Sequence, residues 1–452
     1  MIILYTLKLR ILHYILGFPP ERTGGMTKYA TDLIRVQKKN NKVFVLFPGG
    51  YIHLRRKCWV SFAYTREQVI CYKINNPCVI PLLYGIKRPD KVFHTIDESV
   101  VINFYNSVKP DVIHVHTLMG LPKAFISVAK KMHIRIVYTS HDYFGICLRV
   151  NFVNDRGKVC ETPNPYLCSI CNSSAPKTLF LKLRNMPTLL KYKNVFLSKL
   201  KYNSHSISCT SALVQTNTTP HNLNSYGKLL DTYITMLEQF DIIHFNSTVA
   251  KEVYQSHLKI NKSVVLPITH QGIMDRRKIL HVDGSCIKIG FIGSIAPYKG
   301  FPLLKNILRD LSSQGYNNWL LSVWGGPKGT DKECNNIVYK GKFTARQLEQ
   351  VYQSMDLLIV PSIWKETFSL ITLEALSFGV PVIVSKNVGA KDIVSQYDPH
   401  FVFDSSESLK ELIFQILLDQ EILKEFNKNI LDQPWKHSVE IHAQIIKKEL
   451  YL

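Results

Sequence analysis

A short apolar run, a loop, a helix with one apolar stripe and a second apolar run follow one another in both halves of this 452-residue chain. In the first half this order begins with the run 10–16, continues through a helix over about 26–37 and reaches the next run at 42–47. In the second half it begins at 287–293, and a helix leads to the run 319–324. Short apolar runs joined by helices are typical of parallel strands with helical crossovers. The sequence therefore predicts an α/β fold.

The chain is long enough for two domains, each of which can bury its own core. Residues 272–285 are polar and lack apolar periodicity, so we predict the linker there. The first domain is then expected over residues 1–275 and the second over 276–432. Residues from about 145 to 240 interrupt the first domain with polar, basic and cysteine-bearing sequence. We interpret this stretch as a helical, cysteine-rich insertion.

Two glutamates mark the stretch from Pro361 to Pro381, where a predicted strand leads through a polar loop into a short apolar helix. Glu366 lies in the loop and can reach a sugar ring, while Glu374 lies on the helix, where it can accept hydrogen bonds from a ribose. Both could instead be solvated surface charges, but a charge in a helix that is apolar nearly all round needs a partner. Backbone N–H groups at a helix start suit a phosphate, and here they belong to Thr367, Phe368, Ser369 and Leu370.

Other candidate ligands of a phosphate or a sugar follow predicted strands or begin helices. Lys299 lies between a strand and a helix, where a lysine is either a point charge against a diphosphate or a solvated turn residue. Gly24 and Gly25 open the first helix, which allows close approach of a phosphate or a sugar but equally fits an ordinary turn. His141 follows the predicted strand 134–140, where ligands of open α/β sheets bind. It is either a hydrogen-bond donor to a sugar hydroxyl or a packed core histidine.

Four cysteines lie in the loop-rich start of the insertion with the spacing C-x12-C-x7-C-x2-C: Cys147, Cys160, Cys168 and Cys171. Four thiols that include one CxxC can close a tetrahedral zinc site and so staple a segment with little core of its own. The spacing is irregular, so free thiols are the second interpretation and a redox CxxC is the third. We expect structural zinc.

The formal net charge of +22 comes from 56 Lys and Arg against 34 Asp and Glu. Nucleic acid and an anionic membrane surface are the candidate partners of such a basic chain. No recognisable nucleic-acid motif accompanies the basic residues, so we expect the membrane surface and no nucleic acid. Lys8 and Arg10 interrupt the apolar N-terminus, and no apolar run reaches the length that spans a bilayer. We expect a cytoplasmic protein that associates peripherally with the inner face of the membrane.

The motifs of the second half stand in a specific order: Phe291-Ile-Gly with Lys299-Gly300, then Pro361-Ser362, Glu366, Glu374 and Gly379-Val-Pro381. This order resembles the signature of the C-terminal domain of retaining family 4 glycosyltransferases. The first half is similar to a subgroup of these enzymes that builds cell-surface polysaccharides. The similar stretches are Gly17-Phe-Pro-Pro with Gly24-Gly25, His116 to Pro122, His141 to Cys147 and the four cysteines.

The resemblance implies the GT-B arrangement, in which two doubly wound Rossmann-like domains face each other across a cleft and the final segment, 433–452, packs back on the first. A UDP- or GDP-sugar would lie on the second domain, with Glu374 at its ribose and Lys299 and the N–H groups of Phe368 to Leu370 at its diphosphate. Glu366 and His141 would act at the donor sugar, and the Gly24-Gly25 loop would approach the phosphate. Many relatives carry an arginine where this sequence has Ser294, so Lys299 is the one cation expected at the diphosphate.

The resemblance also implies a retaining hexosyltransferase that needs no divalent metal for transfer. Its acceptor would be a glycan or a lipid-linked intermediate in the synthesis of capsule, O-antigen or exopolysaccharide. The alternative is a catalytically silent GT-B protein that binds a glycan or a partner enzyme, an interpretation for which Ser294 is the best support.

Overall fold

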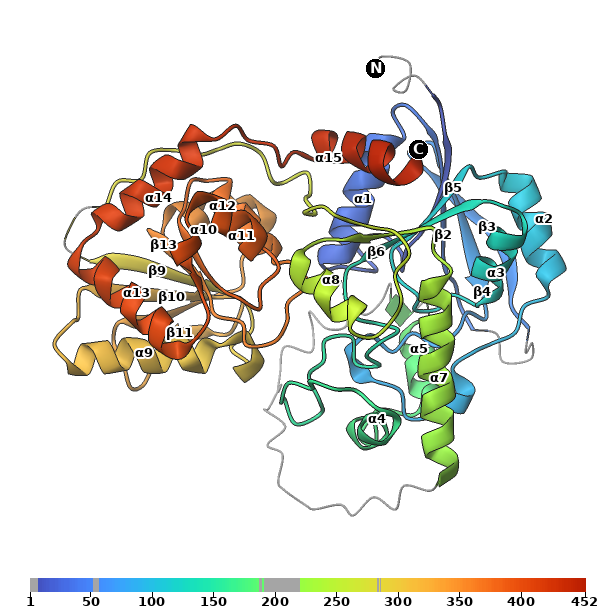
Figure 1. Ribbon diagram of the computed structural model, residues 1–452, viewed down its shortest axis with the longest axis horizontal. Helices are drawn as coiled ribbons and strands as arrows, with labels where there is room; N and C mark the ends of the chain where they lie inside the picture. The colour runs from blue at the N-terminus through green and yellow to red at the C-terminus, as the bar shows by residue number, and fades with distance from the viewer. Residues whose placement is uncertain (1–6, 52–56, 187–188, 191–219, 283, 285) are drawn as a thin grey trace. The chain divides into compact units, whose positions relative to one another are not determined.

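Figure 1 shows the computed structural model of the chain, which describes residues 7–51, 57–186, 189–190, 220–282, 284 and 286–452. The chain forms two compact units. The first comprises Met1–Phe245, Lys251–Leu266 and Ala443–Leu452, and the second comprises Asn246–Ala250 and Pro267–His442. Each unit is an α/β structure built on a mainly parallel sheet.

The first unit contains an eight-stranded sheet in the order β3-β4-β2-β1-β5-β6-β7-β8. All neighbouring strands are parallel except β3 and β4, which form an antiparallel hairpin at one edge. The central strands are buried along their whole length, as expected for parallel strands covered on both faces. The strands are β1 (Arg10–Tyr14), β2 (Lys42–Pro48), β3 (Trp59–Arg66), β4 (Val69–Asn75), β5 (Val112–Val115), β6 (Arg135–Ser140), β7 (Ile242–Phe245) and β8 (Ser263–Val265).

Helices connect the parallel strands of this unit. Between β6 and β7, at the place of the predicted insertion, the described residues include helices α4, α5 and α7, and α4 packs against α7 (Figure 1). The helices are α1 (Gly25–Gln37), α2 (Glu98–Val108), α3 (Ala124–Lys131), α4 (Pro165–Cys171), α5 (Thr178–Arg184), α7 (Pro220–Glu238) and α8 (Thr248–Gln255).

The second unit contains a seven-stranded sheet in the order β11-β12-β10-β9-β13-β14-β15. The chain runs from β9 outward to one side and then returns, so that β13 lies on the other side of β9. Such a reversal is the place where ligands of open α/β sheets bind. The strands are β9 (Ile287–Ile292), β10 (Trp319–Trp324), β11 (Lys328–Thr330, antiparallel to β12), β12 (Ile337–Gly341), β13 (Leu357–Val360), β14 (Val382–Ser385) and β15 (Val402–Phe403).

Amphipathic helices accompany this second sheet. Their apolar faces supply much of its core, for example Leu304, Leu308 and Leu311 of α9. The helices are α9 (Phe301–Ser313), α10 (Leu348–Gln353), α11 (Leu370–Leu376), α12 (Lys391–Tyr397), α13 (Ser406–Leu418) and α14 (Glu421–Asp432). Helix α15 (Val439–Ile446) begins in this unit and ends in the first.

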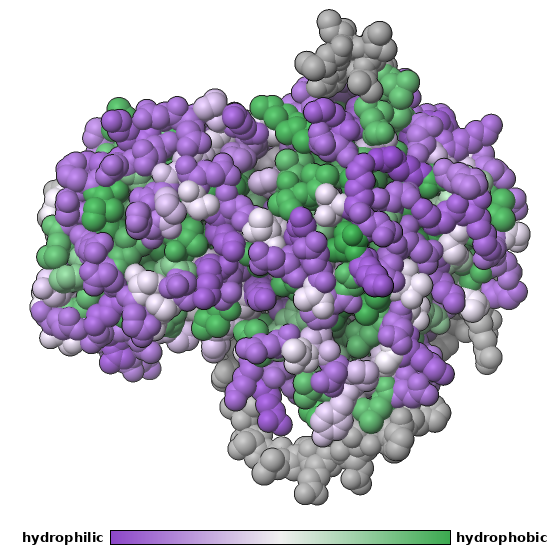
Figure 2. All heavy atoms as spheres, viewed as in Figure 1, coloured by the Kyte–Doolittle hydropathy of each residue, from purple (hydrophilic) through white to green (hydrophobic). Residues whose placement is uncertain are grey.

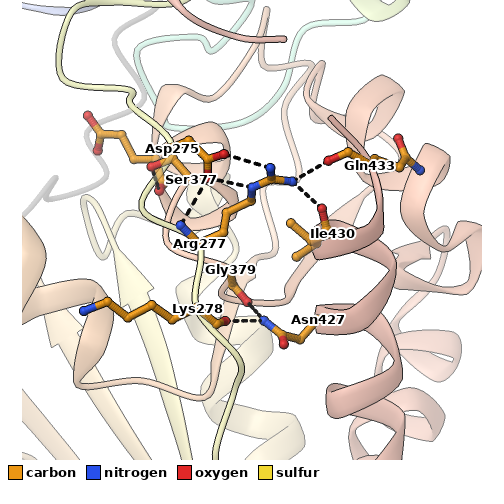
Figure 3. Close-up of polar contacts among 9 residues, drawn as sticks. Asp275, Arg277, Lys278, Ser377, Gly379, Asn427, Ile430 and Gln433 are labelled. Atoms are coloured by element: carbon orange, nitrogen blue, oxygen red, sulfur yellow. Dashed lines mark hydrogen bonds and ion pairs between the residues drawn. The ribbon is translucent and has the colours of Figure 1, made fainter. Parts of the chain in front are cut away.

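The second unit begins at Pro267, earlier than the predicted boundary at residue 276. The segment that follows Pro267 is polar, yet it is held by specific hydrogen bonds (Figure 3). Arg277 donates to the carbonyl of Gln433 at 2.7 Å, and Asn427 donates to the carbonyl of Lys278 at 3.0 Å. These bonds anchor an extended segment to α14, and composition alone does not reveal such an anchor.

The last residues of the chain belong to the core of the first unit. Ile446, Leu450 and Tyr451 are at most 4% exposed and form one apolar cluster with residues of β1, β5, β6 and β7. The predicted final segment, 433–452, therefore divides, since the structural return to the first unit begins at Ala443.

No helix among the described residues is long and apolar enough to cross a membrane. On the face shown in Figure 2, hydrophilic side chains predominate and hydrophobic side chains form smaller groups between them.

Candidate functional site

The candidate site of the second unit lies where β9 and β13 end. These neighbouring parallel strands both lead into loops at the same edge of the sheet. The loop after β9 ends in a short 3₁₀ turn, Pro297–Lys299, and the loop after β13 runs from Pro361 to Ser369. The change of direction between β9 and β13 thus brings together two loops that lie far apart in the sequence.

Lys299 and Glu366 form an ion pair at this edge. The Nζ of Lys299 lies 3.0 Å from Oε1 of Glu366, and the hydroxyl of Ser362 donates to Oε2 of Glu366 at 2.8 Å. The side chains are 25% and 15% exposed, so both are sheltered while remaining accessible to a ligand. The structure therefore brings together two predicted site residues from separate loops and adds Ser362 as a positioning partner.

Trp364 lies beside this pair. The Nζ of Lys299 is 5.1 Å from the centre of the indole ring, within the range of a cation–π interaction. Within the described part of the chain, the indole N–H of Trp364 is buried and has no hydrogen-bond partner. A buried donor without a partner is costly. It is therefore a candidate donor to a bound ligand.

Glu374 is 7% exposed and is held by two residues that the sequence did not indicate. His270 accepts the N–H of Gly272 at Nδ1, so its Nε2 carries the proton that it donates to Oε1 of Glu374, at 2.8 Å. Tyr352 donates its hydroxyl to Oε2 at 2.9 Å, and burial raises the pKa of this hydroxyl well above its usual value. The apolar helix around Glu374 correctly predicted a partnered carboxylate, but no local pattern identifies partners this far along the chain.

Replacing Tyr352 with phenylalanine is expected to lower the free energy of unfolding by about 2 kcal/mol, because a buried carboxylate loses a charge-assisted hydrogen bond. Urea unfolding monitored by circular dichroism measures this change. Tyr339→Phe is the comparison, since its hydroxyl donates to Asp331 at a more exposed position. Equal stability of the Tyr352 variant and the unaltered protein would show that the bond contributes little.

The start of α11 differs from the prediction. The helix begins at Leu370, with Ser369 as its N-terminal cap, so Thr367 and Phe368 belong to the preceding loop rather than to the first turn. Their carbonyl groups accept hydrogen bonds from the Ser247 hydroxyl and the Ala390 N–H, respectively. These hydrogen bonds hold Thr367 and Phe368 in a loop conformation between the end of β13 and the start of α11. Only Leu370 of the four predicted residues lies in the helix.

The backbone of this loop is tightly constrained. Ser369 has a φ of 101°, an unfavourable angle for a residue with a side chain. A Cβ atom on Gly389 would lie 2.2 Å from the carbonyl oxygen of Thr367, so only glycine fits beside the loop. The remaining candidate of this unit, Ser294, is exposed, and its hydroxyl accepts the N–H of Ala296 at 3.3 Å.

The first unit places its predicted residues at the ends of its own strands and helices. Gly24 caps α1 with a φ of 116°, and Gly25 is the first residue of that helix. His141 directly follows β6, as predicted, and its side chain is partly exposed. Its Nε2 lies 3.2 Å from Nδ1 of His116, which is buried. The sequence did not indicate this contact between His116 and His141.

None of these four cysteines forms a disulfide in the structure. Burial and neighbouring cysteines raise the pKa values of Cys147 and Cys168, to about 11 and about 12. The four cysteines therefore lie near one another. Among the described residues, however, no three of their sulfur atoms lie within 4.8 Å of one another. The three side chains that do are His13, His114 and His116. Zinc at the cysteines stays a prediction.

Acidification below pH 6.5 is expected to destabilise the first unit. Burial lowers the pKa of His13 and His244 to about 4 and that of His141 to about 3, so the unfolded chain binds protons there before the folded protein does. Each such histidine lowers the free energy of unfolding by about 1.4 kcal/mol per pH unit as the pH falls from 6.5 toward 4. Burial raises the pKa of Asp142 to about 6, which acts in the opposite direction and offsets about one histidine.

Urea unfolding at pH 7.5, 6.5 and 5.5 measures this dependence. His13→Gln is the control, because it removes one titrating group and should reduce the slope. A free energy of unfolding that stays constant over this range would contradict the expectation.

Comparison with known proteins gives two matching family models. Residues 275–433 match the model described as Glycosyl transferases group 1, and residues 23–159 match the model described as Glycosyltransferase Family 4. The first contains Lys299, Glu366 and Glu374, and the second contains Gly24 and His141. The two models thus cover the candidate residues for the donor, while Cys160, Cys168 and Cys171 lie outside both matches.

Among similar proteins, CapJ of Staphylococcus aureus is 31% identical over 222 residues, which span 45% of this chain and 56% of CapJ. The matched part of this chain thus covers little more than half the length of CapJ. An uncharacterized 42.6 kDa protein in the cps region of Klebsiella pneumoniae is 21% identical over 342 residues, 74% of this chain and 72% of that protein. The crystal structure of Anabaena Alr3699/HepE in complex with UDP and glucose is 13% identical, with a TM-score of 0.53 over 98% of this chain and 99% of that chain. At this identity the structural match shows the fold alone.

Proposed function

On the premise that this chain belongs to the family 4 glycosyltransferases of GT-B type, we propose that it moves a hexose from a nucleotide diphosphate to a growing cell-surface polysaccharide. Similarity to proteins named for capsule and cps regions supports a role in capsule or a related polysaccharide. The silent, purely binding alternative is not favoured by these similarities.

The observation that carries this proposal is the ion pair between Lys299 and Glu366, the latter in the loop that leads into α11. We expect a diphosphate to bind the ammonium group of Lys299 and the backbone N–H groups at the start of α11. Glu374, which is held by His270 and Tyr352, lies about one turn further along the helix and would contact the ribose. The indole N–H of Trp364 adds a buried donor without a partner among the described residues.

In the proposed reaction the acceptor hydroxyl attacks the anomeric carbon on the face from which the diphosphate leaves. The bond between the anomeric carbon and the diphosphate oxygen breaks, the new glycosidic bond forms, and the acceptor proton passes to the leaving diphosphate. The configuration of the sugar is then retained. Lys299 would stabilise the charge on the leaving group, which is the role that a metal ion has in other transferases. Glu366 would orient Lys299 and contact the donor sugar.

Thermal unfolding with a panel of UDP-, GDP- and ADP-sugars tests donor binding. A ligand at about 100 times its dissociation constant stabilises the folded protein by roughly 2.7 kcal/mol. We expect one nucleotide class to raise the melting temperature of the unaltered protein and to have a smaller effect on Lys299→Met. The absence of a shift with every nucleotide sugar would refute a role as a transferase of these donors. NMR of the product formed with a matching acceptor tests retention.

For the acceptor, we propose an anionic amphiphile such as a lipid-linked glycan. The first unit contains a cavity of about 1220 Å³ whose lining includes apolar side chains, five basic side chains and one acid, Asp90. The basic residues are Lys87, Arg88, Lys91, Lys177 and Lys182. Helix α5 borders this cavity and exposes Leu179 and Phe180, 52% and 51% respectively. Positive charge beside exposed apolar side chains is what the anionic head and the apolar chain of a lipid require.

Replacing Lys87, Lys91 and Lys177 with glutamine is expected to weaken binding to anionic vesicles about 100-fold. Each basic residue near a negative surface contributes roughly 1 kcal/mol. Co-sedimentation with vesicles of phosphatidylcholine, with and without phosphatidylglycerol, measures the change. Lys332, Lys340 and Lys342 of the second unit, replaced together, provide a control of equal charge. Equal loss in both triple variants would show a general charge effect rather than a site.

A further inference from the structure

Eight side chains of the first unit form one connected hydrogen-bond network, which we call the histidine network. Seven of them are at most 4% exposed, and the eighth, His141, is partly exposed. One end of the network is the backbone carbonyl of Leu266, and the other end is His141. Its members are His13, Gln37, His114, His116, Thr139, His141, His244 and Tyr451.

The histidines of the network are neutral at neutral pH. Burial lowers the pKa of His13 and His244 to about 4, that of His141 to about 3 and that of His116 well below its usual value. His114 is fully buried between the hydroxyl groups of Thr139 and Tyr451. A neutral imidazole carries one proton, so one ring nitrogen donates and the other accepts. The direction of every bond in the network therefore depends on its neighbours.

The carbonyl of Leu266 sets the direction at one end, because a carbonyl can only accept. His244 must donate from Nε2 to this oxygen, at 2.7 Å, and its Nδ1 must then accept the hydroxyl proton of Thr139, at 3.0 Å. Thr139 has no second proton, so its oxygen accepts from its other two partners, the N–H of His114 Nε2, at 2.7 Å, and the hydroxyl of Tyr29. Nδ1 of His114 is left as an acceptor.

The same order of donors and acceptors continues through Tyr451. Tyr451 donates its hydroxyl to Nδ1 of His114, at 2.7 Å, and its oxygen accepts from the amide Nε2 of Gln37, at 3.1 Å. The amide oxygen of Gln37 then faces Nε2 of His13 at 2.8 Å, so His13 donates there. The order of donors derived from Leu266 thus agrees with the orientation of the Gln37 amide in the structure.

The last two hydrogen bonds extend this order of donors and acceptors to His141, which is partly exposed. Nδ1 of His13 accepts from Nε2 of His116 at 3.1 Å, and Nδ1 of His116 accepts from Nε2 of His141 at 3.2 Å. We infer that the histidine network holds His141 in the tautomer with its proton on Nε2, so that Nδ1 carries no proton. His116 and Tyr451 are therefore positioning residues for His141.

This tautomer changes what His141 can do toward a ligand. The sequence predicted a donor to a sugar hydroxyl, whereas an Nδ1 without a proton accepts a hydrogen bond. A sugar hydroxyl can donate a hydrogen bond to Nδ1, but an ionised phosphate oxygen has no proton to donate. This consequence rests on the proposed function, while the tautomer itself does not.

The test is a two-bond ¹H–¹⁵N correlation spectrum of the full-length protein labelled with ¹⁵N-histidine, because the protonated and unprotonated ring nitrogens have distinct shifts. His141→Gln identifies the signals of His141. We expect a single Nε2–H tautomer at pH 7.5. An Nδ1–H signal for His141 in the unaltered protein would overturn the inference whether or not the protein transfers a sugar.

Tyr451→Phe tests the coupling. Without the hydroxyl, the amide of Gln37 can rotate and both directions of the remaining bonds become allowed. We expect two tautomers of His141 and, if they are equally populated, an apparent affinity for the donor about twofold lower. Thr139→Val breaks the network at another bond and serves if Tyr451→Phe does not fold.

Tyr105→Phe is the matched control. It removes a buried hydroxyl that donates to the carbonyl of Phe125, outside the network, and should leave His141 unchanged. A single Nε2–H tautomer that persists in both Tyr451→Phe and Thr139→Val would also overturn the inference, because His141 would then be held by other contacts.

Discussion

Replacing Lys299 with methionine is expected to lower kcat for sugar transfer by about 100- to 1000-fold. Lys299 would stabilise negative charge that grows on the leaving diphosphate, and the loss of one such group typically has an effect of this size. The folded state should change little, since Lys299 is partly exposed and its partner Glu366 keeps the hydrogen bond from Ser362. The measurement is steady-state kinetics with the nucleotide sugar that most raises the melting temperature.

The control is Lys365→Met, because Lys365 is an exposed lysine directly before Glu366 in the same loop. It should retain kcat within about twofold if only Lys299 acts on the diphosphate. Adding Glu366→Gln to both backgrounds completes a double-mutant cycle. Strictly additive effects on kcat would contradict the claim that Glu366 orients Lys299. Unchanged kcat in Lys299→Met would contradict the proposed role of the lysine itself.

Gly300→Ala is expected to destabilise the second unit by about 3 kcal/mol or more. The Cβ atom of an alanine would lie 1.7 Å from the carbonyl oxygen of Pro361, and the φ of +76° is unfavourable for a residue with a side chain. Neither obstacle can be removed by a side-chain rotation, because both involve the backbone. The turn that carries Lys299 would have to move away from the loop that carries Glu366.

Urea unfolding and donor binding together test this expectation. Gly326→Ala is the matched control, because a Cβ atom there would meet no atom within 4 Å. We expect the control to unfold at nearly the same urea concentration as the unaltered protein, while Gly300→Ala unfolds earlier and binds the donor more weakly. Equal stability of the two variants would show that the loops can separate without cost.

The sequence predicted features that depend on local pattern. The strands and helices around Lys299, Glu366 and Glu374 follow from apolar periodicity and from glycine and proline at their ends, and the structure confirms them. The placement of His141 after β6 follows in the same way. Local pattern also showed that Glu374 needed a partner, because an unpartnered charge does not persist in an apolar helix.

Other features depend on contacts between distant segments, which one sequence does not reveal. His270 and Tyr352 meet at Glu374 only after the chain folds, and neither belongs to a recognisable motif. The hairpin of β3 and β4 was missed, although it forms the edge of the first sheet. The start of α11 was placed too early because the bonds to the carbonyls of Thr367 and Phe368 come from elsewhere in the unit.

The C-terminal cluster has a consequence for synthesis of the protein. Ile446, Leu450 and Tyr451 complete a core that also contains Leu9 and Ile11. The ribosome therefore makes one part of this core early in translation and the other part late. After Leu266 the ribosome adds 186 residues up to Leu452, which takes about 10 to 40 s at typical rates of translation. During that time, Ile11 of β1 and Val112 of β5 lack the apolar contacts that the C-terminal residues provide. A chain without Ile446, Leu450 and Tyr451 would leave apolar side chains of these strands exposed and prone to aggregation.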